Sequence, residues 1–251
     1  MLNAANAGSQ RPDDALWVTE VSGCLLRSFL QRLFPRPVED VGQAARMLAG
    51  DALHRTVLPL VAKSVRGCRG EVEREVVVPI DGFDVRGRAD LVLECGGERY
   101  VVELKTMYSK PARLDEPMPP HVRQLQYYMN ALGAPRGAVV YIDVQRGGVK
   151  AFELERDPGY MTELRSRARA LWRALEALRP PRPERAPYNC HGCPFYFDCV
   201  SGKYREMVET LRRRRHTQQG AGGGEGKGYS RGGRRFRGAG GWGRRSSRSS
   251  R

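Results

Sequence analysis

Three consecutive stretches decide the fold: GRADLVLE (residues 87–94), CGGE (95–98) and RYVVELK (99–105). The outer stretches are rich in the apolar and β-branched residues of strands, and Gly96-Gly97 is a favoured two-residue hairpin loop. We therefore predict an antiparallel hairpin. If the two glycines form the loop, Cys95 pairs with Glu98, which fixes the register of the whole hairpin.

Counting back in that register sets Asp90 directly across from Glu103, with Cβ atoms roughly 4.5–5.5 Å apart. The two-residue alternation of a strand places Lys105 on the same face as Glu103, while Val102 and Leu104 point the other way. Like charges opposite each other are destabilising unless a cation lies between them. Two carboxylates and a lysine around a hard metal predict a hydrolytic phosphodiester site.

The alternative is a surface hairpin whose charges are solvated, as Arg88 and Glu94 would be. The apolar run Val101-Val102 with Leu104 favours a strand that is buried around its charges. Buried carboxylates without a partner are costly, so burial again favours a bound cation.

The rest of the chain predicts an α/β (α+β) fold with a central mixed sheet flanked by helices. The long helix over 38–65 has Val41, Ala44, Ala45, Leu48 and Ala52 at helical spacing. The expected helices are 16–33, 38–65, 121–132, 160–178 and 202–214, and the expected strands are 72–80, 83–94, 99–105, 137–144 and 149–154. A Pro-rich loop spans 111–120, and Pro180-Pro181-Arg182-Pro183 reads as a linker.

The charge is unevenly distributed along the 251 residues. Residues 212–251 hold 12 arginines and Lys227 against Glu225, so most of the net charge of +15 lies at this end. From residue 217 the chain is mostly Gly, Arg and Ser with isolated aromatics, which predicts a disordered tail. Such tails bind single-stranded nucleic acid weakly; the alternative is a solubilising appendage. A polar N-terminus without a long apolar run predicts a cytoplasmic protein that spans no membrane.

Further polar residues gather on two of the predicted helices. His54, near the middle of the long helix, would be structural or solvated if taken alone, but beside two carboxylates it is a candidate third ligand that suits Mn²⁺. On the later helix, His121, Gln124 and Tyr128 follow i, i+3, i+7. They lie beside a core stripe of Val122, Leu125, Met129 and Leu132. These polar groups are either boundary residues or reach a phosphate, and their spacing does not decide between the two.

The cysteines predict a metal or cluster site. Cys190, Cys193 and Cys199 form CxxC followed by x5-C, and the candidates for a fourth ligand are His191, Cys24, Cys68 and Cys95. Three Cys with His would favour zinc, whereas four thiolates allow zinc or an iron–sulfur cluster. The alternative is a set of reduced cysteines that only pack. Cys68 and Cys95 fall in predicted turns, so we expect both to be free.

These motifs together resemble the RecB-type PD-(D/E)XK nucleases over about residues 16–205. The matching residues are Gly50-x3-His54, Gly87-Arg88-Ala89-Asp90, Glu103-Leu104-Lys105 and Gln124-x3-Tyr128. An early cysteine with a late CxxC-x5-C resembles the CRISPR-associated exonucleases of that superfamily, the "Cas-four" kind. The resemblance implies a restriction-endonuclease-like core at 16–183 and a cysteine-rich segment with a last helix at 184–216 packed on the N-terminal helix. Composition adds a flexible leader at 1–15 and the tail at 217–251, which is not part of the family pattern.

The resemblance also implies roles for individual residues. His54, Asp90, Glu103 and the Leu104 carbonyl would hold Mn²⁺ or Mg²⁺, with Lys105 at the attacking water. Gln124 and Tyr128 would complete the site. The remaining implied ligands, those of a [4Fe–4S] cluster, are Cys24, Cys190, Cys193 and Cys199.

The biology implied is trimming of DNA ends for CRISPR spacer acquisition, beside the integrase complex, with a homo-oligomer as one compatible state. One alternative is a recombination or repair nuclease that works with a partner helicase. Another is a non-catalytic nucleic-acid-binding protein whose tail does the binding. Deleting residues 217–251 would distinguish the non-catalytic binder from the nucleases. The deletion should leave cleavage intact in a nuclease and abolish binding in a protein that binds through its tail.

Overall fold

The computed structural model describes residues 14–38, 40–108 and 114–221. The chain divides into two units, Met1–Arg212 and Arg213–Arg251, and the fold described below is that of the first. Most of the predicted leader and the tail beyond residue 221 lie outside the described residues. The last helix continues to Ala221, past residue 217, where the sequence predicted the tail to begin.

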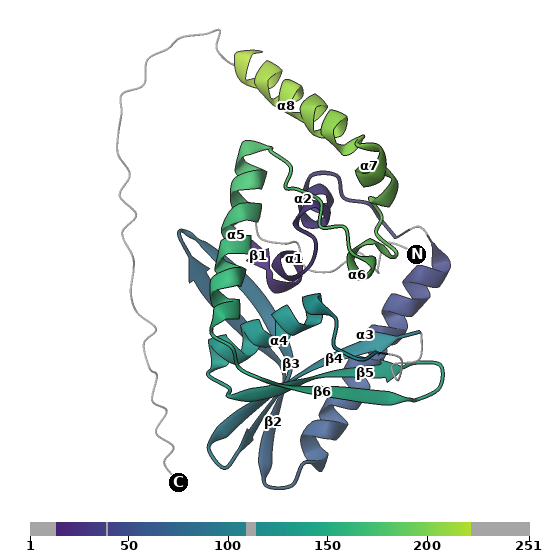
Figure 1. The fold of residues 1–251 in the computed structure, drawn as a ribbon, viewed down its shortest axis with the longest axis vertical. Helices are drawn as coiled ribbons and strands as arrows, with labels where there is room; N and C mark the ends of the chain where they lie inside the picture. The colour runs from purple at the N-terminus through teal and green to yellow at the C-terminus, as the bar shows by residue number, and fades with distance from the viewer. Residues whose placement is uncertain (1–13, 39, 109–113, 222–251) are drawn as a thin grey trace, which may run out of the picture. The chain divides into compact units, whose positions relative to one another are not determined.

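In the described residues, a short strand and three helices are followed by three strands, a helix, two strands and four helices (Figure 1). Their order is β1 (Ala15–Trp17), α1 (Val18–Ser22), α2 (Leu25–Leu33), α3 (Val41–Ser64), β2 (Cys68–Ile80), β3 (Phe83–Cys95), β4 (Glu98–Met107), α4 (Pro119–Leu132), β5 (Arg136–Asp143), β6 (Val149–Glu155), α5 (Gly159–Ala177), α6 (Pro187–Cys190), α7 (Tyr196–Ser201) and α8 (Tyr204–Ala221).

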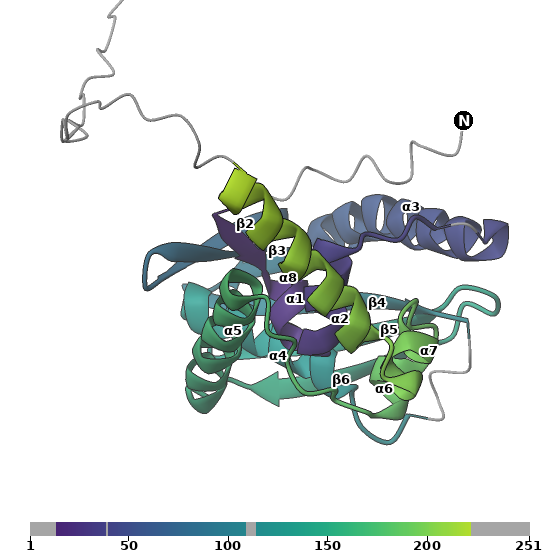
Figure 2. The ribbon, with the colours of Figure 1, turned by 90° about the horizontal axis from the view of Figure 1, so that it is seen from above.

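The strands form one sheet in the order β1-β3-β4-β5-β6, with β2 also paired to β3. The β1–β3 and β4–β5 pairs are parallel and the others are antiparallel, so the sheet is mixed, as predicted. Helices α1, α2, α4 and α5 lie over one face, and α3 lies against the other (Figures 1 and 2). The larger core cluster, which includes Phe29, Leu125 and Leu171, is under the first group. A smaller cluster lies under α3 around Leu58 and Leu91.

The central hairpin has the predicted loop and register. Gly96 and Gly97 both have positive φ angles, 59° and 90°, which a two-residue turn of this kind requires and glycine adopts freely. Cys95 pairs with Glu98, and the β3–β4 ladder continues as far as Leu91 opposite Val102. Extending this register would set Asp90 opposite Glu103, as the sequence predicted, but the ladder ends at Leu91 and Val102 and does not include that pair.

The regular alternation of β3 breaks at Asp90, which the sequence did not predict. Val85 and Ala89 face the larger core cluster, whereas Leu91, an even number of residues further on, belongs to the smaller cluster on the other face. On the paired strand β2, the ladder skips Glu73, whose φ of 53° is unusual for a residue with a side chain. The change of facing on β3 and the gap in the β2–β3 ladder therefore coincide at the position that carries the first acid.

The sequence predicted one continuous helix over 16–33, which is wrong. This segment forms the end of a short strand, β1, and two separate helices, α1 and α2. The backbone is extended at Gly23, and Cys24 is the N-cap of α2. The guanidinium of Arg167 donates to the carbonyl oxygens of Val21 and Gly23, which satisfies groups at the end of α1 without a continuing helix.

The apolar stripe predicted on α3 mostly lies at the surface. Ala44 is buried, but Val41 is 70% and Leu48 is 56% exposed. The residues of α3 that are buried or half-buried against the sheet include Gly50, His54 and Leu58, spaced one helical turn apart. This face was missed because glycine and histidine do not stand out as core residues in a hydrophobic pattern.

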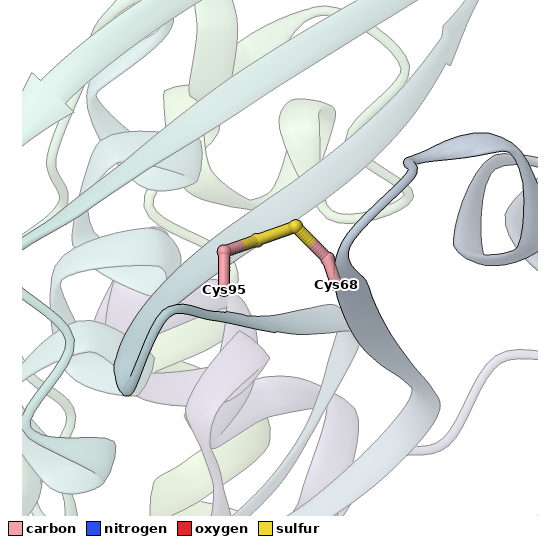
Figure 3. The surroundings of a disulfide bond; sticks show 2 residues. All are labelled: Cys68 and Cys95. Carbon is pink, nitrogen blue, oxygen red and sulfur yellow. A yellow bond between two sulfur atoms is a disulfide. The ribbon is translucent and has the colours of Figure 1, made fainter.

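The expectation that Cys68 and Cys95 are free is wrong. They form a disulfide that joins the ends of β2 and β3 (Figure 3). The β2 strand begins at Cys68 rather than at residue 72, so its ladder with β3, which omits only Glu73, sets the two cysteines opposite each other. Counting back from the turn that pairs Ile80 with Phe83 would have found this pair.

Candidate functional site

Asp90 lies where β3 and β4 separate, and its two oxygens have different neighbours. Oδ2 accepts a hydrogen bond of 2.7 Å from the backbone N–H of Leu104. Oδ1 lies 3.6 Å from Nδ1 of His54, an ion-pair distance that is too long for a hydrogen bond. The Asp90 carboxylate thus accepts from the backbone of β4, as a backbone carbonyl of the paired strand would. Its other oxygen, Oδ1, lies near His54 on α3.

Glu103 and Lys105 point to the same side of β4, as the alternation predicted. Lys105 Nζ lies 2.6 Å from Glu103 Oε1 and donates to Gln124 Oε1 on α4 at 2.9 Å. The Glu103 side chain is only 2% exposed. Its second oxygen, Oε2, is buried and has no hydrogen-bond partner within the described part of the chain. An orphaned buried carboxylate oxygen is costly and fits a site that binds a cation.

The electrostatics of this pair follow from burial. Burial, together with the negative charge of Asp90, raises the pKa of Glu103 to about 7. Burial alone would lower the pKa of Lys105, but the charges of Glu103 and Asp90 outweigh it and raise that pKa above its ordinary value. Lys105 is therefore an ammonium group at neutral pH, whereas Glu103 readily exchanges its proton.

His54 is brought to the sheet by a close approach of α3 to β4. A Cβ at Gly50, one turn before His54, would lie only 3.0 Å from Oγ1 of Thr106. The neighbouring Asp90 carboxylate raises the pKa of His54 above its ordinary value, although partial burial opposes this. The small residue in the motif Gly50-x3-His54 thus lets the helix place the imidazole beside the acid.

A second close approach positions Tyr128. A Cβ at Gly87 on β3 would lie 2.7 Å from Cε1 and 2.8 Å from the hydroxyl oxygen of Tyr128. Burial, with the nearby charges of Glu103 and Asp90, raises the pKa of Tyr128 well above its ordinary value, so the phenol stays protonated. The structure thus brings His54, Gln124 and Tyr128 to one region with the hairpin acids, although their chemical roles remain predictions.

Sequence reasoning did not identify Tyr141, on β5, as part of this neighbourhood. The Tyr141 hydroxyl accepts a 2.9 Å hydrogen bond from the Met118 backbone N–H and lies 2.9 Å from Nδ1 of His121. His121 had been noted only as a polar member of the α4 face, one turn before Gln124. A tyrosine in an otherwise apolar strand gave no local signal that it reaches this face.

The cysteine motif forms a second candidate site. Cys24, Cys190, Cys193 and Cys199 are all free and half-buried, and all line one cavity of ≈ 420 Å³. Burial raises the pKa of Cys193 above its ordinary value. His191 is exposed and does not line this cavity, and the remaining cysteines are in the disulfide. Of the fourth-ligand candidates, only Cys24 shares the cavity.

The cysteine-rich segment packs on the N-terminal helices, as the predicted fold requires. Arg36, after α2, donates to the carbonyl oxygen of Pro194 at 2.5 Å and to Asp198 Oδ2 at 2.6 Å. Its guanidinium also lies over the ring of Phe195, 4.5 Å from the ring centroid. These contacts hold Cys24 near the CxxC motif, although the two lie far apart in sequence.

Both donor sets suit their metals chemically, but neither is preassembled. Hard divalent cations favour carboxylate oxygens, and thiolates suit zinc or iron–sulfur clusters. Among residues 14–38, 40–108 and 114–221, no three His, Cys, Asp or Glu side chains are already arranged to hold an ion. The ligands would therefore have to close around a metal when it binds. In the same residues, no helix combines the length and apolar character needed to cross a bilayer.

Comparison with known proteins agrees with this geometry. Residues 6–199 match the PD-(D/E)XK nuclease superfamily. The CRISPR-associated exonuclease Cas4 of Saccharolobus solfataricus (strain ATCC 35092 / DSM 1617 / JCM 11322 / P2) is 29% identical over 141 residues, which cover 54% of this chain and 67% of that protein. The crystal structure of SSO0001 is similar in fold, with a TM-score of 0.59 and 22% identity, covering 79% of this chain and 93% of that one.

Proposed function

The chain belongs to the PD-(D/E)XK nuclease superfamily, and on this premise we propose that it is a divalent-metal-dependent DNA exonuclease whose site is the Asp90–Glu103–Lys105 cluster. The observation that carries the proposal is the buried Oε2 of Glu103, which has no hydrogen-bond partner in the described part of the chain and lies near a second acid. A cation would offset the repulsion between Glu103 and Asp90 and would give Oε2 of Glu103 the contact that it lacks.

In this proposal the metal ligands are the carboxylates of Asp90 and Glu103, the imidazole of His54 and the carbonyl oxygen of Leu104. A divalent cation bound there would polarise a phosphate oxygen and lower the pKa of a bound water. The Asp90–Leu104 hydrogen bond supports this set, because it fixes the acid against the backbone whose carbonyl would be the fourth donor.

Lys105 acts as a positive charge in this proposal and not as a proton acceptor, because its pKa is raised. Its ammonium group would orient the attacking water and stabilise the negative charge that develops on the phosphate. Gln124 holds this ammonium group at 2.9 Å, and Tyr128 contributes a neutral phenol that can only be a weak acid at neutral pH.

We further propose that Cys24, Cys190, Cys193 and Cys199 hold an iron–sulfur cluster, [4Fe–4S] in the first instance. Four free thiols that line one largely apolar cavity support this reading over a zinc site with His191. A cluster there would tie α2 to the C-terminal segment. Because long loops cost more entropy to close, such a cross-link would add to stability.

The proposed role is trimming of DNA ends, most readily single-stranded ends, for CRISPR spacer acquisition beside the integrase complex. It is supported by the similarity to an exonuclease described as CRISPR-associated. The substrate, the partner and a cytoplasmic location all belong to the proposal.

The test is cleavage of end-labelled single- and double-stranded DNA with Mn²⁺, Mg²⁺ or EDTA. Asp90→Ala and Lys105→Ala should abolish the metal-dependent shortening of labelled ends while circular dichroism shows an intact fold. Asp84→Ala is the matched control, because Asp84 lies on the same strand but its half-buried carboxylate pairs with Arg86. Full activity in both the Asp90 and Lys105 variants would discard the catalytic assignment.

A further inference from the structure

His121 lies in the first turn of α4 and lines a second cavity, of ≈ 510 Å³. Gln124, which holds Lys105, lines the same cavity one helical turn further on. Arg27 and Tyr188 lie on other walls of this cavity. The cavity therefore adjoins the proposed catalytic cluster through Gln124.

The Tyr141 hydroxyl links the backbone of Met118 to the imidazole of His121, and the tautomer of the ring sets the direction of the second bond. The backbone N–H of Met118 can only donate, so the Tyr141 oxygen accepts this 2.9 Å bond. In one tautomer of His121 the Tyr141 hydroxyl donates its proton to Nδ1, 2.9 Å away, and in the other Nδ1–H donates to the same oxygen. A neutral imidazole whose Nδ1 accepts must carry its proton on Nε2. Burial lowers the pKa of His121 to about 3, so the ring is neutral.

In the tautomer whose Nδ1 accepts from Tyr141, the Nε2–H group is an N–H donor on a residue that lines the cavity. Within the described residues, Tyr141 is the only hydrogen-bond partner of the His121 ring. The acid that also lines the cavity, Glu20, is bound by Arg32 at 2.8 Å. Arg27, in contrast, is exposed and makes no ion pair in the described part of the chain. A neutral N–H donor with a nearby guanidinium suits a phosphate oxygen.

We propose that His121 is a substrate-contacting residue whose Nε2–H donates to a non-bridging phosphate oxygen of the DNA strand, and that Tyr141 positions the ring for this contact. The inference rests on the proposed nuclease function. It assigns strand binding to His121, not a step in bond cleavage, because the neutral ring has its acceptor nitrogen occupied by Tyr141. Loss of the contact should therefore weaken binding and raise KM more than it lowers kcat.

Two substitutions separate the two nitrogens of the ring. His121→Asn keeps an acceptor near the position of Nδ1, where it can still bind Tyr141, but has no group that reaches as far as Nε2. His121→Gln extends an amide N–H to about the position of Nε2 and sacrifices the Tyr141 bond. A residue with a structural role alone should tolerate asparagine better, whereas a substrate contact should tolerate glutamine better.

The first measurement is binding of a labelled oligothymidylate in EDTA, where no metal-dependent cleavage occurs, followed by KM and kcat with Mn²⁺. We expect His121→Asn to weaken binding and raise KM roughly tenfold, the usual effect of losing one hydrogen bond to a charged group. His121→Gln should stay within about threefold of the wild type. Wild-type binding by His121→Asn, whatever the glutamine variant does, would overturn the inference.

The second measurement uses the unmodified protein, so it does not depend on a variant that folds. Long-range ¹H–¹⁵N NMR of the imidazole should show the Nε2–H tautomer of His121 and a shift of Nε2 when the oligothymidylate is added in EDTA. The Nδ1–H tautomer, or an unchanged Nε2 signal at saturating DNA, would contradict the inference. Failure of the wild type to cleave DNA with any metal is a separate result, which would refute the proposed function.

Discussion

Replacing Glu103 with glutamine should stabilise the metal-free protein while it removes activity. Glutamine imitates the protonated carboxyl group. In the folded protein the pKa of Glu103 is raised from 4.5 to about 7, so folding favours the protonated form. The resulting stability is fully present below pH 4.5 and is lost as the pH rises through 7. At pH 8 the wild type therefore has a buried negative charge that the variant lacks.

The size of the effect follows from the pKa difference. Each pKa unit is worth about 1.4 kcal/mol. The rise in the pKa of Glu103 therefore sets an upper limit of about 3 kcal/mol on the stabilisation by glutamine at pH 8. The amide N–H₂ that replaces Oε2 would itself be buried and would need an acceptor, which lowers the expected gain. We therefore expect a gain of roughly 1–3 kcal/mol in the free energy of unfolding, or several degrees in Tm. Near pH 4.5 the difference should vanish.

The assay is thermal unfolding of both proteins in EDTA between pH 4.5 and 8, repeated at pH 8 with Mn²⁺. Manganese should raise the Tm of the wild type and not that of the variant, because an ion that binds only the folded state stabilises it. Glu94→Gln is the matched control: Glu94 is on the neighbouring strand, its pKa is lowered by Arg99, and its loss should not stabilise the protein. An equal or lower Tm for Glu103→Gln at pH 8 would refute the reasoning.

Two further predictions concern packing and the cluster. Gly87→Ala should lower the free energy of unfolding by roughly 1–3 kcal/mol and reduce cleavage, because its methyl group would overlap the ring of Tyr128. Denaturation and cleavage assays check this. Gly148→Ala, where the nearest atom is 3.9 Å away, should be almost neutral in both. Cys193→Ala should lose a brown chromophore and much of the thermal stability, whereas Cys68→Ser should keep the colour; an anaerobically purified wild type that is colourless and contains zinc would defeat the iron–sulfur assignment.

The hairpin was predictable because its register is set locally. The Gly96-Gly97 turn fixes the alignment, and every later pair follows by counting. The same counting from the preceding turn would have paired Cys68 with Cys95, but the polar residues after Cys68 concealed the start of β2. Register arguments succeed when the strand limits are known and fail when a polar edge hides them.

Other features depend on tertiary contacts that no local pattern records. The exposed stripe of α3 resembles a core face by spacing, but the helix contacts the sheet through Gly50 and its neighbours, where lack of a side chain allows the approach. The reversal of facing at Asp90 shows only in which core cluster each neighbour joins, and the contact between Tyr141 and His121 joins β5 to α4. These are long-range consequences of the fold.

The most direct test of the central claim is anomalous diffraction from crystals of the metal-free protein soaked in Mn²⁺. We expect one peak in the catalytic region, within ligand distance of the carboxylates of Asp90 and Glu103, and its absence in crystals of Asp90→Ala. A peak elsewhere, or carboxylates that bind no ion at saturating Mn²⁺, would contradict the assignment of this cluster as the metal site.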